Sequence, residues 1–256
     1  MRLIRYQTRD VAARFGWVHD DMVGPVEGSP FGEFIRADAE LPIASVKLLP
    51  PVLPTKIICV GRNYAAHARE QNAEVPEVPL LFLKPFSALI GAGDSIELPP
   101  QSEQVDHEAE LAVVIGKTGR WITAGEALDY VFGYTIANDV TARDLQWKDG
   151  QWTRAKGFDT FCPVGPWIET EFDPSDVVIT CKVNDETRQM GSTRDMVFSV
   201  RQLIAYASSI MTLEPGDLLL TGTPAGVSPL HPGDVVEVEI EGLGTLKNPV
   251  ISAANR

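Results

Sequence analysis

The stretch DHEAELAVVIG, residues 106–116, is the most informative part of the sequence, because two acidic residues lead directly into an apolar run. In a strand, side chains at i and i+2 lie on one face, so Glu108 and Glu110 point the same way. Two adjacent carboxylates repel unless a proton or a cation joins them. Hard cations such as Mg²⁺ prefer oxygen ligands. The stretch indicates either a metal site at the start of a strand or an exposed strand start with two solvated glutamates.

Strand-like runs dominate the chain on both sides of this stretch. They occupy residues 56–60, 80–83, 131–137, 177–183, 217–221 and 235–240, with a hairpin turn expected at Asn184-Asp185. A helix is expected from its cap Ser199 to Met211, a second at residues 63–72 with Asn63 as its cap, and a shorter helical piece at residues 126–130. Because helices do not alternate with strands, we predict a mostly β (α+β) fold.

The first quarter of the chain has a different character. Residues 1–40 predict a small β unit, with strand-like runs at residues 3–6 and 13–18. Residues 41–55 contain four prolines, which exclude a helix or a central strand and favour an extended linker. We therefore expect a small N-terminal domain with its linker at residues 1–54 and a catalytic domain at residues 55–256.

Composition narrows the class of protein. The chain has 22 Lys and Arg against 35 Asp and Glu, a formal charge of −13, so we expect no nucleic-acid partner. The three cysteines form no C-x-x-C pair, which favours buried free thiols over a disulfide framework. Neither a signal peptide nor an apolar run of about 20 residues is visible. We expect a cytoplasmic protein without a membrane partner.

Four further motifs carry polar groups that suit catalysis, and each has a plainer alternative. Asp139 follows an apolar strand and is either a third metal ligand or part of a turn. His67 and Glu70, three residues apart on a helix, form either an acid–base pair or a surface pair. Lys156 is either a pocket ammonium or a loop lysine. The turn in LLLTGTPAGV, residues 218–227, either holds a carboxylate through backbone N–H groups or is an ordinary loop.

Taken together and in this order, five blocks resemble the successive motifs of the fumarylacetoacetate hydrolase family. The blocks are VGRNYAAHARE, DHEAELAVVIGK, GYTIANDVTARDLQ, AKGFDTFCPVGPW and LLLTGTPAGV, and the resemblance covers roughly residues 55 to 250. It implies a mixed β-roll around a metal site, preceded by the small N-terminal domain of the bacterial members. It also implies a homodimer and a small 2-oxo acid as substrate.

The resemblance assigns roles to individual residues. It implies that Glu108, Glu110 and Asp139 bind Mg²⁺ or Mn²⁺, and that His67, Glu70 and Lys156 are catalytic. The implied substrate-binding residues are Arg62, Asn63, Tyr64, Arg143, Gln146, Gly222 and Thr223. Two features depart from the family pattern. His107 stands where many members carry Tyr, and residues 147–155, which we expect to border the pocket, form a shorter loop than in some relatives.

The reaction expected from the resemblance is hydrolytic cleavage of a C–C bond in acylpyruvate-like 2,4-dioxo acids, such as fumarylpyruvate, fumarylacetoacetate or acetylpyruvate. In that reaction His67, helped by Glu70, deprotonates a water, and Lys156 supplies positive charge to a developing oxyanion. The alternatives are oxaloacetate decarboxylation and isomerisation or decarboxylation of a 5-carboxymethyl-2-hydroxymuconate-type compound. A more distant one is a non-catalytic ligand-binding protein on the same fold.

Overall fold

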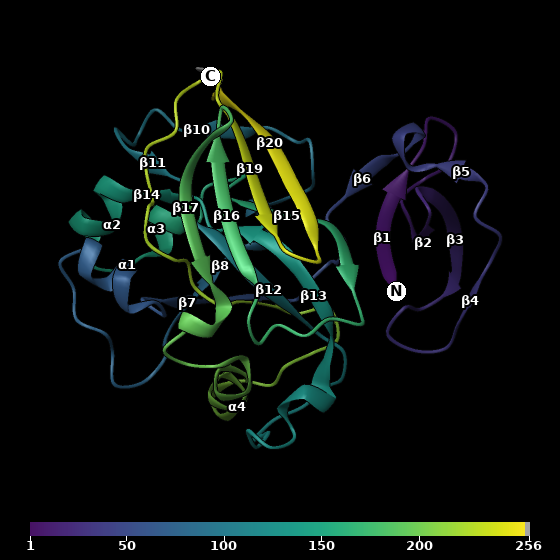
Figure 1. The fold of residues 1–256 in the computed structure, drawn as a ribbon, viewed down its shortest axis with the longest axis horizontal. Helices are drawn as coiled ribbons and strands as arrows, with labels where there is room; N and C mark the ends of the chain where they lie inside the picture. Colours follow the sequence, from purple (N-terminus) through teal and green to yellow (C-terminus); the bar gives the residue numbers. More distant parts are fainter. Residues whose placement is uncertain (254–256) are drawn as a thin grey trace.

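A computed structural model describes residues 1–253 of the chain, and strands make up most of its regular structure. In these residues a large sheet has 13 strands, a second sheet has 5 and a third has 2. The N-terminal strands form a purple lobe beside the larger body, which holds the remaining sheets and helices (Figure 1). The predicted mostly β fold with a small N-terminal β domain is confirmed.

The N-terminal lobe is an antiparallel extension of the large sheet. Its strands are β1 (Arg2–Gln7), β2 (Arg14–His19), β3 (Met22–Gly28) and β4 (Phe34–Arg36). Asp20 and Asp21 connect β2 to β3 with φ angles of 47° and 62°, as a tight hairpin turn requires. Arg2 and Leu3 of β1 pair with the end of β15 (Cys162–Glu169), which joins the lobe to the body.

The proline-rich segment after β4 is not the unpaired linker that we expected. It contains β5 (Leu41–Pro42), a 3₁₀ turn η1 (Ile43–Ser45) and β6 (Lys47–Leu49). β5 pairs with β3, and β6 pairs with β1, both beside the main path of the sheet. The prolines still stay out of central strands, because a residue without an N–H is tolerated at a sheet edge.

The rest of the large sheet runs in the order β15, β13, β12, β18, β7, β8. The bounds of these strands are β7 (Ile57–Gly61), β8 (Leu80–Lys84), β12 (Ala109–Ile115), β13 (Val131–Asn138) and β18 (Leu218–Leu220), with β9 (Leu89–Ile90) paired beside β15. Every residue of β12 is buried. Leu111 and Val113 pack in one apolar cluster and Ala112 and Val114 in another, so β12 is covered on both faces.

A second sheet packs against this central strand. It contains β10 (Ile96–Leu98), β16 (Val178–Val183), β17 (Glu186–Ser192), β19 (Val235–Ile240) and β20 (Gly244–Ser252). Val113 of β12 shares an apolar core with Cys181 of β16 and Val238 of β19. The turn between β16 and β17 has Asn184 and Asp185 at φ angles of 51° and 67°, which confirms the predicted hairpin. The third sheet pairs β11 (Val105–Asp106) with β14 (Thr141–Ala142).

Helices are few and short. They are α1 (Ala65–Glu70), α2 (Arg143–Asp149), α3 (Thr153–Lys156) and α4 (Val200–Ile210), with 3₁₀ turns η2 (Phe86–Ala88), η3 (Ala127–Tyr130) and η4 (Thr193–Asp195). Ser199 caps α4 as predicted, since its side chain accepts from the N–H of Gln202, whose side chain in turn accepts from the N–H of Ser199. None of the described helices has the length and apolar character needed to cross a membrane.

One predicted helix differs from the structure, and two observed helices were not predicted. The helix expected at residues 63–72 is limited to α1, and Asn63 is not its cap, because Tyr64 occupies that position without a side-chain bond. Asn63 is instead buried and donates to the carbonyl oxygens of Phe198 and Thr221, at 3.0 and 2.7 Å. Helices α2 and α3 were not predicted, although Gly150 ends α2 with a φ of 67°, a common helix C-terminus.

Candidate metal and acid–base site

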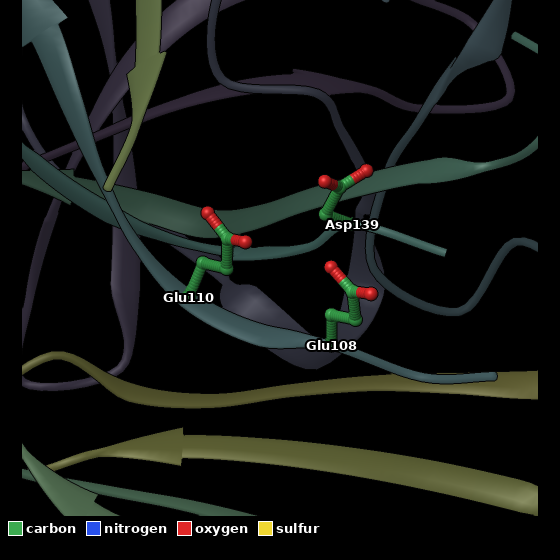
Figure 2. Close-up of side chains that lie close together, drawn as sticks. All are labelled: Glu108, Glu110 and Asp139. Atoms are coloured by element: carbon green, nitrogen blue, oxygen red, sulfur yellow. The ribbon is translucent and has the colours of Figure 1, made fainter. Parts of the chain in front are cut away.

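Three carboxylates converge at the start of β12. Figure 2 shows Glu108 and Glu110 projecting from one stretch of backbone towards Asp139 on the neighbouring segment. One oxygen of each carboxylate lies within 4.8 Å of the others, and all three side chains are buried. Asp139 reaches this place because it directly follows β13, and its N–H donates to the carbonyl oxygen of Glu108 at 2.9 Å. The alternative of two solvated glutamates is therefore wrong.

Basic side chains neutralise two of these carboxylates. Lys156 donates to Glu108 Oε2 at 2.8 Å and to Asp139 Oδ2 at 2.6 Å. Lys84 also donates to Asp139, and Arg143 donates to the other oxygen of Glu108. Burial opposes the charge on Glu108, but Lys156 and Arg143 outweigh it and hold the pKa of Glu108 below its usual range. Burial likewise opposes the charge on Lys156, but its carboxylate partners raise the pKa of Lys156.

Glu110 is the carboxylate without a cationic partner in residues 1–253. Its Oε2 accepts from the backbone N–H of Gly222 at 2.7 Å. Burial raises the pKa of Glu110 well above its usual value, and the nearby Asp139 and Glu108 raise it further. No Lys or Arg of the described residues binds Glu110 directly, and the three converging side chains offer carboxylate oxygens as ligands. Glu108, Glu110 and Asp139 therefore fit a divalent cation, which prefers such ligands and removes their mutual repulsion.

His67, the imidazole of the predicted acid–base pair, lines a cavity together with the three carboxylates. The volume of this cavity is about 280 Å³. His67 Nδ1 lies 3.2 Å from Glu70 Oε2, so Nε2 is the nitrogen left for a ligand. The backbone N–H of Gly226 donates to Glu70 Oε1 at 2.9 Å. Burial raises the pKa of Glu70, but the hydrogen bonds from His67 and Gly226 lower it to a value below the usual range.

The turn after β18 supports both groups. Of its two predicted alternatives, a turn that holds a carboxylate or an ordinary loop, the first applies, and the carboxylates are the protein's own: Gly222 donates to Glu110 and Gly226 donates to Glu70. Both glycines have positive φ angles, 93° and 104°. A Cβ at Gly226 would lie 2.1 Å from the carbonyl oxygen of Arg188, so only glycine fits there.

Several expected substrate-binding residues have protein partners instead. Thr223 lines the cavity, but its hydroxyl donates to the carbonyl oxygen of Ala109 at 2.9 Å and accepts from Gln189 at 2.7 Å. Arg143 and Gln146 line the cavity and bind each other at 2.6 Å. Arg143 also donates to Asp106 at 2.8 Å, so its guanidinium is held between protein groups.

Arg62 lies in the cavity wall, whereas the next two residues, Asn63 and Tyr64, do not. Asn63 ties the loop before α1 to Phe198 and Thr221. Tyr64 is buried, and burial raises the pKa of its hydroxyl, whose oxygen has no hydrogen-bond partner in the described residues. Neither Asn63 nor Tyr64 is placed to contact a ligand in the cavity.

The two departures from the family pattern have clear positions. His107 is buried and its ring bonds to Gln189 and Ser228, both at 2.9 Å, and it does not line the cavity. The loop at residues 147–155 borders the cavity as expected, through Trp147, Gly150 and Trp152.

Sequence reasoning missed Lys84 and Asp106. Lys84 ends the apolar strand β8 and is fully buried, where it also donates to the carbonyl oxygen of Val140 at 3.0 Å. A lysine that follows an apolar strand and precedes Pro85 was the available signal. Asp106 was quoted with the acidic stretch but given no role, because its partner Arg143 lies 37 residues away.

Two known families match the chain, one over its N-terminal residues and the other over most of the rest. Residues 56–251 match the family described as fumarylacetoacetate (FAA) hydrolase C-terminal, and residues 1–51 match the one described as Rv2993c-like, N-terminal. The chain is 49% identical over 223 residues to the mitochondrial oxaloacetate tautomerase Fahd2a of Rattus norvegicus, covering 82% of this chain and 71% of the relative.

Two solved structures show the same fold over the whole chain. One is 5-carboxymethyl-2-hydroxymuconate delta-isomerase from Mycobacterium smegmatis, 46% identical with a TM-score of 0.93. The other is a fumarylacetoacetate hydrolase from Exiguobacterium antarcticum, 40% identical with a TM-score of 0.86. Each match covers 99% of this chain and 100% of the other.

Proposed function

Because the chain belongs to the fumarylacetoacetate hydrolase family, we propose that it is a divalent-metal-dependent enzyme that moves a proton at the carbon next to the carbonyl of a small 2-oxo acid. One observation carries this proposal: His67, which is bound to Glu70, shares one small cavity with the three buried carboxylates. A base and a cation-binding site at one place are what enolisation of a 2-oxo acid requires.

The proposed metal is Mg²⁺ or Mn²⁺, held by Glu108, Glu110 and Asp139. Both ions suit carboxylate ligands, and three protein oxygens leave coordination positions for a substrate. When bound, the ion would act as a Lewis acid that polarises the 2-oxo group and so makes the neighbouring C–H more acidic.

The reaction that demands least of these residues is a keto–enol or related isomerisation. His67 Nε2 takes a proton from the carbon next to the ketone, and the C–H electron pair becomes the C=C bond of an enolate. The imidazolium then returns the proton to the enolate oxygen, which gives the enol, or to another carbon of a conjugated substrate. Glu70 stabilises the imidazolium during the transfer. The tautomerase and isomerase names of two relatives support this reaction.

Hydrolytic C–C cleavage of an acylpyruvate is the second candidate. A cavity of about 280 Å³ leaves room for a water, about 30 Å³, beside a small 2-oxo acid. His67 would then deprotonate that water rather than the substrate carbon. The hydrolase name of another relative supports this reaction. Lys156, whose ammonium binds Glu108 and Asp139, is better placed to hold these carboxylates than to stabilise an oxyanion.

A matched kinetic assay separates the candidates. The metal-loaded protein is assayed on enol oxaloacetate, acetylpyruvate and fumarylpyruvate, with EDTA in parallel. We expect keto–enol conversion of oxaloacetate to be the fastest reaction by kcat/KM and EDTA to abolish it. Faster release of pyruvate from a diketo acid would make the chain a hydrolase, and faster loss of CO₂ from oxaloacetate would make it a decarboxylase. No turnover of any of the three would favour a ligand-binding protein.

A further inference from the structure

Among the cations of the cavity wall, Arg62 is the one that binds no acidic side chain in residues 1–253. Arg143 is bound to Asp106 and Glu108, and Lys156 to Glu108 and Asp139. His67 is bound to Glu70. Arg62 lines the same cavity and, within residues 1–253, its guanidinium makes no hydrogen bond or ion pair. A half-buried guanidinium without a carboxylate partner is available for an anionic ligand.

An aromatic wall fixes the place of this guanidinium. Arg62 Cζ lies 6.0 Å from the centroid of the Trp152 ring. Trp152 packs edge-on against Phe82, with ring centroids 5.1 Å apart and planes at 75°. It also fills the space above Gly61, where a Cβ would lie 2.6 Å from the indole. A guanidinium beside an aromatic face keeps its N–H edges free for a planar anion.

The backbone of Arg62 points to a functional role as well. Its φ is 57°, a left-handed conformation that is uncommon for residues other than glycine and favours Asn and Asp. The next residue holds it there, because Asn63 donates to the carbonyl oxygens of Phe198 and Thr221 and accepts from the N–H of Phe198 at 2.8 Å. Backbone strain that neighbouring bonds maintain is concentrated at ligand-binding positions.

We propose that Arg62 binds a second carboxylate of the substrate, the one remote from the 2-oxo end, and so selects 2-oxo dicarboxylates over 2-oxo monocarboxylates. This inference rests on the proposed function, since it assumes that the 2-oxo end lies at Glu108, Glu110 and Asp139. A planar guanidinium binds a carboxylate through two parallel hydrogen bonds. The three acidic side chains of the same cavity would otherwise repel a dianion.

The test compares equilibrium binding of ligand pairs that differ in one carboxylate. Calorimetry on the Mg²⁺-loaded protein measures 2-oxobutanedioate against 2-oxobutanoate, and 2-oxopentanedioate against 2-oxopentanoate. We expect at least one dicarboxylate to bind about 10- to 100-fold more tightly than its partner, the range of a charged hydrogen bond. Arg62→Asn, which suits the left-handed backbone, should bring this ratio to within about threefold. Arg69→Gln, an exposed change on α1 outside the cavity, should leave it unchanged.

Oxalate serves as the internal control because it is small enough to bind at the metal alone. Its affinity should be the same in the wild type and in Arg62→Asn. A dicarboxylate preference that is absent from the wild type, or that survives Arg62→Asn, would overturn the inference. Loss of oxalate binding in Arg62→Asn would also overturn it, because Arg62 would then support the metal site. The binding measurement does not depend on turnover. If the protein converts no 2-oxo acid but its dicarboxylate preference is lost in Arg62→Asn, only the proposed reaction is refuted.

Discussion

At the scale of single residues, Lys and Arg side chains bind the buried carboxylates of the site, except at Glu110. Lys84, Lys156 and Arg143 are each bound to Glu108 or Asp139, while Glu110 has a single backbone donor. Burial of an unpaired carboxylate is unfavourable, which is why its pKa is raised. A cation at this place would convert an unfavourable group into a ligand.

The first prediction concerns Glu110→Gln. The change removes a buried charge without altering the shape, so the metal-free variant should unfold at a temperature no lower than the metal-free wild type. Saturating Mn²⁺, at about 100 times its Kd, should stabilise the wild type by about 2.7 kcal/mol and raise its Tm by about 5–10 °C. The variant should show little of this shift. Differential scanning calorimetry with and without Mn²⁺ measures both.

Glu103→Gln is the matched control, because Glu103 is exposed and lies outside the cavity. It should keep the full Mn²⁺ shift. An equal shift in Glu110→Gln and the wild type would show that the metal does not use Glu110.

The sequence was informative about which residues meet here and uninformative about their partners. The two-residue period of a strand places Glu108 and Glu110 on one face whatever the rest of the fold does. The partners of Thr223 and Arg143 could not be predicted, because Gln189 and Asp106 lie more than 30 residues away along the chain. Because these distant partners could not be predicted, polar groups that bind other parts of the protein were expected to bind substrate.

At the scale of elements, short segments hold the site from several directions. The turn after β18 binds Glu110 and Glu70, and Asn63 ties the loop before α1 to the segment that leads into α4. Predictions based on local chemistry succeeded where that chemistry decides, as at the Asn184-Asp185 hairpin and the Ser199 cap. Asn63 has an equally good capping side chain, but that side chain forms tertiary hydrogen bonds instead.

The second prediction concerns the Ser199 cap of α4. Ser199→Ala removes the bond to the N–H of Gln202, so the free energy of unfolding should fall by about 1 kcal/mol. Ser199→Asn keeps a good capping group and should retain most of that stability. Urea denaturation of the metal-free proteins measures the difference. A loss of equal size in both variants would mean that the serine stabilises α4 in another way.

At the scale of the whole molecule, the central claim depends on pairing between distant parts of the chain. β18 lies parallel to β7 and antiparallel to β12, which brings residues 57–61, 109–115 and 218–220 side by side. Strand-like runs alone do not specify such an order, because a strand can form the same kind of backbone hydrogen bonds with any other strand. The resemblance of five ordered motifs supplied the expectation of a mixed β-roll around a metal site, and the strand order comes from the structure. The expected homodimer stays a prediction.

The most direct test of the central claim is exchange of the hydrogens next to the ketone of oxaloacetate or 2-oxobutanoate in D₂O, followed by NMR. We predict that the Mg²⁺- or Mn²⁺-loaded protein catalyses this exchange above the rate with the metal alone. Addition of EDTA should return it to background, and His67→Gln should slow it by about 10²–10⁴-fold, the usual contribution of a general base. Exchange at the wild-type rate in His67→Gln, or with EDTA present, would contradict the account.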